Sequence, residues 1–245
     1  MDHTNNSCCC GEAEHFSGCL ICGAPIKYNA ESSIQICSIC HKEQLTNAVC
    51  ENGHFVCDTC HSYGSYIPVI TALRNSTEKD PLILLERIME LPSVHMHGPE
   101  HHAIVPCVLL TALRNNGERM DYDTALSEIC KRAKQVPGGT CGYWGVCGAA
   151  AGAGIFMSVM TGSGPLHKDA WPFPQKLVSD ILSRLADVGG PRCCKRTSRI
   201  AIEEAIRFYS QFSSVKIPLS SVLCKYFEDN KECIREDCPY YPVSK

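Results

Sequence analysis

Four pairs of metal-binding side chains fall within residues 19–60, and they constrain the fold of this chain more than any other feature. A CxxC turn points two thiolates at one tetrahedral ion, so eight such ligands make two closed zinc sites. A segment this short, with few large apolar residues, needs the metal in order to fold. We therefore expect a two-zinc module over residues 18–64, with these ligands: Cys19, Cys22, Cys37, Cys40, Cys50, His54, Cys57 and Cys60.

The spacing leaves open how the ligands divide between the two ions. In a sequential arrangement, the first four ligands hold one ion and the last four hold the other. The stretch from Cys37 to Cys60 resembles the first six ligands of a RING finger of the seven-in-absentia type, with the last pair missing downstream. The resemblance implies that Cys19 and Cys22 replace that pair from upstream. The sites would then be crossed: Cys37, Cys40, Cys57 and Cys60 on one ion, and Cys19, Cys22, Cys50 and His54 on the other.

The rest of the chain is predicted to be helical from Tyr66 onward, because apolar residues recur at helical spacing and no region alternates with period two. Asp80 before Pro81, and Asp123, are the expected helix caps. The predicted class is mainly α: the small zinc module, an all-α helical domain over residues 65–215 and a Cys-rich segment over 216–245. Residues 1–17, with Cys8, Cys9 and Cys10, are expected to be a flexible tail. The predicted helices cover residues 82–91, 101–115, 124–136, 146–161, 174–188 and 194–212.

Cysteine usage is the outlier in composition, with 19 among 245 residues. A small secreted protein would use them as a disulfide framework, but here they cluster as CxxC and CC pairs and no signal peptide begins the chain. Metal ligation or thiol chemistry in a reducing compartment fits better. The net charge of −3 and the absence of a long apolar run argue against nucleic acid and membrane partners. We expect a cytoplasmic protein.

Glycine and alanine dominate residues 138–154, where a turn leads into a predicted helix. Each glycine in a helix costs about 1 kcal/mol relative to alanine, so close helix packing is expected to offset that cost. Cys147 begins this helix, and the helix N-terminus stabilises a thiolate. Another helix begins at Cys193 and Cys194, whose basic neighbours would lower a thiol pKa. We predict that four cysteines gather in one catalytic site: Cys141, Cys147, Cys193 and Cys194.

Four histidines and a glutamate lie within residues 95–102, just before an apolar helix. Imidazole and carboxylate groups together suit zinc or iron. We expect this loop to lie over the thiol site, with His95 as a metal ligand. Catalytic roles are expected for His97, Glu100 and His101, as proton carriers or further metal ligands.

Three cysteines also mark the polar C-terminal segment: Cys224, Cys233 and Cys238. Three thiolates need a fourth ligand to enclose zinc, or they can leave an open position on an iron–sulfur cluster. We expect these residues to bind a cofactor. Zinc and an iron–sulfur cluster are therefore the expected cofactors of the chain.

The sequence Gly139-Thr-Cys141, then Cys147-Gly-Ala-Ala-Ala-Gly-Ala, then Cys193-Cys194, resembles the redox-active C-GCAxxG-C-C family. The same cysteines, with the histidine-rich stretch from His95, resemble a Cys-rich archaeal and bacterial domain of unknown function, found beside radical-SAM or methyltransferase modules. These resemblances imply a thiol or metal site. We expect a redox-active thiol protein that binds zinc and an iron–sulfur cluster and is accessory to a partner enzyme such as a radical-SAM enzyme or a methyltransferase. The alternative is a non-catalytic zinc-finger adaptor that binds another protein. Distances between Cys147, Cys193 and the histidines distinguish the two.

Overall fold

The computed structural model describes residues 18–242, apart from the side chains of residues 62–65, so the expected tail with Cys8, Cys9 and Cys10 lies outside it. The chain is mainly helical, and all six predicted helices are present with ends within three residues of those expected. Within the described residues, every helix is too short or too polar to cross a lipid bilayer. The elements are β1 (Ile26–Ile36), β2 (Glu43–Cys50), α1 (Asp58–Asn75), α2 (Pro81–Met89), α3 (Glu100–Asn115), α4 (Tyr122–Ala133), α5 (Thr140–Tyr143), α6 (Gly148–Thr161), α7 (Pro172–Val188), α8 (Cys194–Tyr209) and the short 3-10 helix η1 (Arg235–Asp237).

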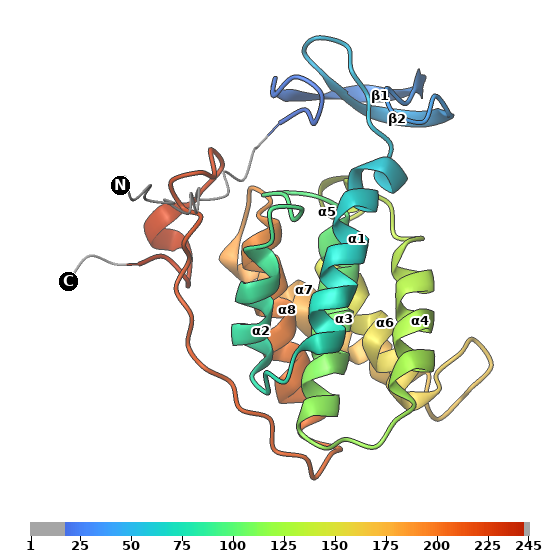
Figure 1. The fold of residues 1–245 in the computed structure, drawn as a ribbon, viewed down its shortest axis with the longest axis vertical. Helices are drawn as coiled ribbons and strands as arrows, with labels where there is room; N and C mark the ends of the chain where they lie inside the picture. Colours follow the sequence, from blue (N-terminus) through green and yellow to red (C-terminus); the bar gives the residue numbers. More distant parts are fainter. Residues whose placement is uncertain (1–17, 243–245) are drawn as a thin grey trace, which may run out of the picture.

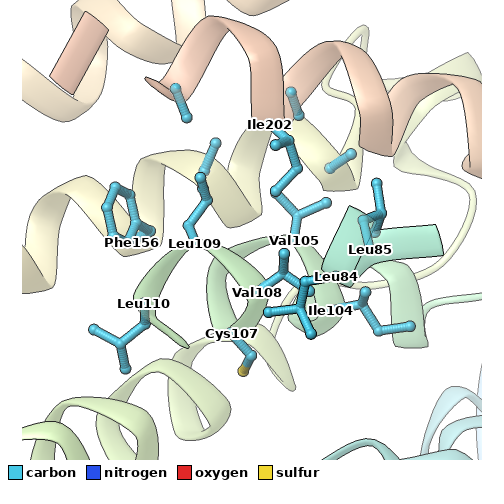
Figure 2. Close-up of a cluster of buried hydrophobic side chains, with 14 of the residues drawn as sticks. Leu84, Leu85, Ile104, Val105, Cys107, Val108, Leu109, Leu110, Phe156 and Ile202 are labelled. Atoms are coloured by element: carbon cyan, nitrogen blue, oxygen red, sulfur yellow. The ribbon is translucent and has the colours of Figure 1, made fainter. Parts of the chain in front are cut away.

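Helix α3 lies at the centre of the helical bundle, buried on every side from Glu100 to Leu113. A helix that is apolar all round can be stable only when other elements surround it. Helices α1, α2, α4, α6 and α8 do so here. Figure 2 shows the contact: side chains of α3 meet Leu84 and Leu85 from α2, Phe156 from α6 and Ile202 from α8.

The N-terminal module contains an antiparallel hairpin that the sequence did not predict. Strand β1 pairs with β2 from Ile26 opposite Cys50 to Ile36 opposite Glu43, with an irregularity between Tyr28 and Ser33. Most residues of β1 are exposed on both faces. Without a buried face, the strand carries no alternating apolar pattern, which is the signal on which strand prediction depends. The hairpin lies at one end of the bundle (Figure 1).

Helix α1 joins the module to the bundle without a break. It begins at Asp58, directly after Cys57, although the sequence predicted helix only from Tyr66. The expected boundary between residues 64 and 65 therefore falls inside one helix. At its start, Asp58 Oδ2 accepts a hydrogen bond of 2.8 Å from the backbone N–H of Gly138, which ties the module to the turn before α5.

The two expected helix caps have different outcomes. Asp80 caps α2, because its Oδ1 accepts hydrogen bonds from the amides of Leu82 at 2.8 Å and Ile83 at 3.2 Å. Asp123 does not cap α4. That helix begins at Tyr122, and Asp121 caps it by accepting from the Thr124 amide.

The glycines of α6 have the packing role expected of them. A Cβ at Gly148 would lie 2.1 Å from the His102 ring, and one at Gly152 would lie 2.4 Å from the His102 carbonyl oxygen. On another side, a Cβ at Gly154 would lie 2.5 Å from Val178 of α7. The missing side chains therefore let α6 approach both α3 and α7 more closely than any other residue would allow.

The C-terminal segment returns along the outside of the bundle toward the module end (Figure 1). It is anchored at Ser220, whose amide donates a hydrogen bond of 2.6 Å to Asp80 Oδ2. Farther along, Tyr226 lies under Lys195 of α8, with 4.6 Å between the Nζ atom and the ring centre. These contacts bring the last three cysteines next to the start of α8.

Candidate metal centres

The module brings its eight expected ligands into two groups of four, and the groups are crossed. One group is Cys19, Cys22, Cys50 and His54, and the other is Cys37, Cys40, Cys57 and Cys60. In the first, Cys22 and Cys50 have their sulfurs 3.8 Å apart, and His54 Nδ1 lies 3.3 Å from the Cys22 sulfur. In the second, the sulfurs of Cys40 and Cys57 are 3.7 Å apart. Zinc–sulfur bonds of about 2.3 Å in a tetrahedron place the sulfurs about 3.8 Å apart, so both groups have room for one ion.

The thiols of the second group cannot all ionise without a cation between them. Burial opposes ionisation of Cys37, but backbone N–H groups, that of Cys40 foremost, lower its pKa to about 6. Burial and the neighbouring thiols raise the pKa of Cys60 to about 12. Like charges held this close disfavour one another, and a bound divalent ion removes that penalty.

A third group has fewer ligands and lies outside the module's two closed sites. It consists of His61 in α1, His95 in the loop before α3, and Glu100 at the first position of α3, with ligand atoms within 4.8 Å of one another. His95 Nδ1 lies 3.0 Å from Glu100 Oε1, and His61 Nδ1 lies 3.4 Å from Glu100 Oε2. The two imidazole rings meet edge to face, 4.6 Å apart.

Glu100 is ionised in spite of its burial. The carboxylate is 2% exposed, a position that normally favours the neutral acid. Burial opposes its ionisation, but His61 and His95 outweigh that effect and hold the pKa of the Glu100 carboxyl well below its usual range. Both His61 Nδ1 and Glu100 Oε2 are buried without a hydrogen-bond partner, although they face each other. Two ligand atoms left unsatisfied at this distance are arranged as they would be around a cation.

The third group opens into a cavity of about 450 Å³ between the module and the bundle. His61, His95 and His97 line it on one side, and Cys141, Cys194 and Arg192 line it as well. Arg192 pairs with no carboxylate in the described part of the chain; its guanidinium instead donates a hydrogen bond to Tyr28 Oη of the hairpin. The cavity therefore offers a positive charge, two thiols and a metal-binding group in one space.

The four cysteines predicted to share a site divide between two places. Cys141 and Cys194 line the cavity beside the third group. Burial raises the pKa values of both thiols, and the charge of Cys147 acts in the same direction. Cys193 lies on the other side of the α8 start, against the C-terminal segment. Cys193 is the extended N-cap residue of α8 and Cys194 its first helical residue, so the two side chains diverge. No three of the four sulfurs form a ligand group among the described residues.

The basic residues around Cys193 and Cys194 do not lower the thiol pKa values as expected. Burial raises the pKa of Cys194 to about 12 and also raises that of Cys193. Arg192 and Arg196 act in the opposite direction, but desolvation outweighs them. Every cysteine in the described part of the chain is free of disulfide bonds.

The other two predicted catalytic histidines surround the third group without joining it. His97 lines the cavity and its Nε2 donates to Asn230 Oδ1 at 3.2 Å and Glu232 Oε2 at 2.9 Å. His101 is fully buried, with Nδ1 at 3.2 Å from the Gly98 carbonyl. Burial lowers the pKa of His101 to about 3, so the imidazole is neutral. It contacts the loop before α3 through the Gly98 carbonyl.

Sequence reasoning missed His61 because it sits next to a cysteine already assigned to zinc. Its signal is weak: it is one imidazole, separated by more than thirty residues from His95. Helix α1 continues from the module into the bundle, and this places His61 in contact with His95 of the loop before α3. A pair of thiols, the buried Cys107 and the half-buried Cys130, was also unforeseen; their sulfurs lie 3.8 Å apart between α3 and α4.

The three C-terminal cysteines line a second, small cavity together with Cys193. No three of these sulfurs lie within 4.8 Å of one another.

Comparison with known proteins identifies a family for most of the chain but no function. A family of unknown function, DUF5714, matches residues 69–241. This range includes His95, Glu100 and all the cysteines from Cys107 onward, and it begins after the module and His61. No curated protein and no solved structure matches the chain. The chain belongs to the DUF5714 family.

Proposed function

We propose that this member of the DUF5714 family is a metal-dependent enzyme with an open metal centre at His61, His95 and Glu100. The module would hold two structural zinc ions in its crossed sites, and the third ion would act on a substrate in the adjoining cavity. The observation that carries the proposal is the convergence of three ligands from three different segments of the chain, beside a cavity.

The number of ligands separates the third site from the other two. Four protein ligands close a zinc site, whereas two histidines and one carboxylate leave positions for water or substrate. The same ligand set suits zinc in hydrolytic centres and iron(II) in oxygenases. An ion here would polarise a bound group or lower the pKa of a bound water.

The lining of the cavity indicates an anionic substrate. Arg192 presents a guanidinium that forms no close ion pair within the described residues and donates to Tyr28 Oη, and planar guanidinium groups bind carboxylates and phosphates well. The thiols of Cys141 and Cys194 border the same space. The proposal therefore includes the redox role expected for these thiols, with the chain working beside a partner enzyme.

Cobalt binding tests the proposal, because cobalt reports its ligands through its visible spectrum. The metal-free, reduced protein is titrated with Co²⁺ as wild type, as His95→Ala and as His167→Ala. His167 is an exposed histidine away from the cavity and serves as the matched control. We expect His95→Ala to bind one equivalent less than wild type, with its thiolate-to-cobalt band unchanged. Equal binding by His95→Ala and wild type would refute the open centre.

A second candidate, the protein-binding adaptor, is favoured by one observation on the hairpin. Ile34 and Leu45 lie opposite each other across the two strands and are 67% and 66% exposed. Ile36, two residues along β1, is 59% exposed. Clustered apolar residues on an exposed strand pair are typical of a protein-binding surface. If the hairpin binds a partner protein, Ile34→Lys should abolish that binding and leave the number of cobalt ions bound by the protein unchanged.

A further inference from the structure

A second constellation of thiols lies where the C-terminal segment meets α8. Cys193 at the N-cap of α8 and three cysteines of the segment line one small cavity. We propose that these four thiolates hold an iron–sulfur cluster, with Cys193 as the fourth ligand that Cys224, Cys233 and Cys238 lack. The site shares no residue with the centre at His61, His95 and Glu100.

The local turns present these sulfurs as metal-binding turns do. The amide of Tyr226 donates to the Cys224 sulfur at 3.4 Å, and that of Arg235 donates to the Cys233 sulfur at the same distance. In both cases the donor lies two residues after the cysteine. Such hydrogen bonds stabilise the thiolate that a metal requires. The zinc module uses the same arrangement, from Ile21 to Cys19 at 3.4 Å and from Ile39 to Cys37 at 3.5 Å.

Cys193 is held toward the other three cysteines by two donors. The amide of Arg196 donates to its sulfur at 3.4 Å, and Asn230 Nδ2 of the C-terminal segment does so at 3.6 Å. Cys224, Cys233 and Cys238 line the same small cavity as Cys193. The start of α8 and the C-terminal segment therefore contact each other where these four cysteines lie.

One buried guanidinium beside the cavity, that of Arg196, favours an anion there. Arg196 is 3% exposed, pairs with no carboxylate within the described residues, and has a buried Nε atom without a hydrogen-bond partner. Its Nη2 atom donates only to backbone carbonyls of the preceding turn. Arg199, by contrast, is neutralised by Glu86, to which its Nε and Nη2 atoms donate hydrogen bonds of 2.6 and 2.8 Å. A buried, uncompensated guanidinium is costly, and a thiolate-bound cluster supplies the missing negative charge.

The sulfurs around the second cavity are not gathered round a single point as those of the N-terminal module are. In the zinc module, sulfurs of one group approach to 3.7 and 3.8 Å. Among the described residues, no three of the sulfurs that line the second cavity lie within 4.8 Å of one another. A cluster of the [4Fe–4S] type takes one thiolate on each iron, so its four ligands stand farther apart than ligands on one zinc ion. Four cysteines complete that ligand set.

Anaerobic reconstitution of the full chain with ferrous iron and sulfide tests the proposal. The wild-type protein should bind iron and acid-labile sulfide in equal amounts and gain a broad visible absorption band. The variants Cys193→Ser and Cys224→Ser should lose most of this band. Cys194→Ser is the matched control, because this neighbour of Cys193 faces the other cavity, and it should keep the band.

The possible results separate the cluster, its ligands and the cavity metal. Zinc without iron or sulfide at this site, lost on Cys224→Ser, would overturn the cluster. A full band in Cys193→Ser would overturn Cys193 as the fourth ligand. If the variants fail to fold, alkylation of wild-type protein decides instead: the four cysteines must be protected after reconstitution and reactive before it. Cobalt binding at His95 is read separately, so either site can fail without the other.

Discussion

Glu100 shows how a single buried side chain defines the candidate centre. Glu100 is the first residue of α3 and is buried. Its carboxylate faces two imidazoles, His61 and His95, which come from different segments of the chain. The loop histidines were visible in the sequence, as was the glutamate. Their partner His61 was not, because ligand sets of this kind are assembled by tertiary contacts. Sequence spacing reveals ligands only when they share one turn.

Replacing Glu100 with glutamine should weaken metal binding while keeping the side-chain volume. Loss even of an outer-shell partner costs about 10–100-fold in metal affinity, so loss of a direct ligand should cost at least about 100-fold. Competition for Co²⁺ with a coloured chelator measures the change. Glu118→Gln, at a glutamate bonded to Tyr209 and Ser213 outside the cavity, is the control and should bind as wild type does. Unchanged affinity in Glu100→Gln would remove this residue from the site.

Asp80 allows a prediction about stability alone. One oxygen caps α2 and the other receives the Ser220 amide of the C-terminal segment. Asp80→Ala removes both interactions: loss of a cap typically costs about 1 kcal/mol, and loss of the hydrogen bond from Ser220 about 1 kcal/mol more. We expect urea unfolding to show a loss of about 2 kcal/mol or more, reduced in Asp80→Asn, whose amide oxygen still accepts. A loss of only a few tenths of a kcal/mol in the free energy of unfolding would show that neither the cap nor the bond from Ser220 stabilises the protein.

At the scale of elements, the helices followed from the sequence and the strands did not. Helical patterning and caps in the sequence predicted α2, α3, α4, α6, α7 and α8, and each of them contributes apolar side chains to a common core. The hairpin carries no such pattern, since its strands are held by the ligand turns at their ends rather than by a buried face. The glycines of α6 indicated close helix packing, because such packing offsets the free-energy cost of glycine inside a helix.

Adding one methyl group to α6 tests that contact. Gly152→Ala would place a Cβ 2.4 Å from the backbone carbonyl oxygen of His102, which cannot move away as a side chain could. Overpacking of this kind costs about 1–3 kcal/mol. Gly142→Ala, where a Cβ meets nothing within 4 Å, is the control. Thermal unfolding should show a lower melting temperature for Gly152→Ala only; equal melting of the two variants would contradict the close packing.

Over the whole molecule, two parts depend on different sources of stability. The bundle has an extensive apolar core around α3, whereas the module buries little beyond Cys37, Phe55 and Cys57. The sequence anticipated this contrast and left open how the eight ligands divide, and the structure gathers them into two crossed groups of four. It also placed Cys193 and Cys194 in one site with Cys141 and Cys147, whereas the two side chains diverge at the start of α8 and line different cavities.

Removal of zinc should therefore unfold the module and spare the bundle. After exhaustive chelation under reducing conditions, we expect hairpin amides to lose protection from hydrogen exchange while those of α3 keep it. The variant Cys57→Ser should lower the zinc content by one equivalent. A metal-free protein with a fully protected hairpin would show that the ligands are not what holds the module together.

The open centre at His61, His95 and Glu100 is tested most directly by anomalous X-ray diffraction at the metal absorption edge, on crystals of protein purified without chelators. The two module sites provide an internal reference for occupancy. We predict a third anomalous peak about 2.0–2.2 Å from one ring nitrogen of His61, one of His95 and a Glu100 oxygen, the range of zinc bonds to these ligands. Full peaks at both module sites with none between these three residues would contradict the proposed centre.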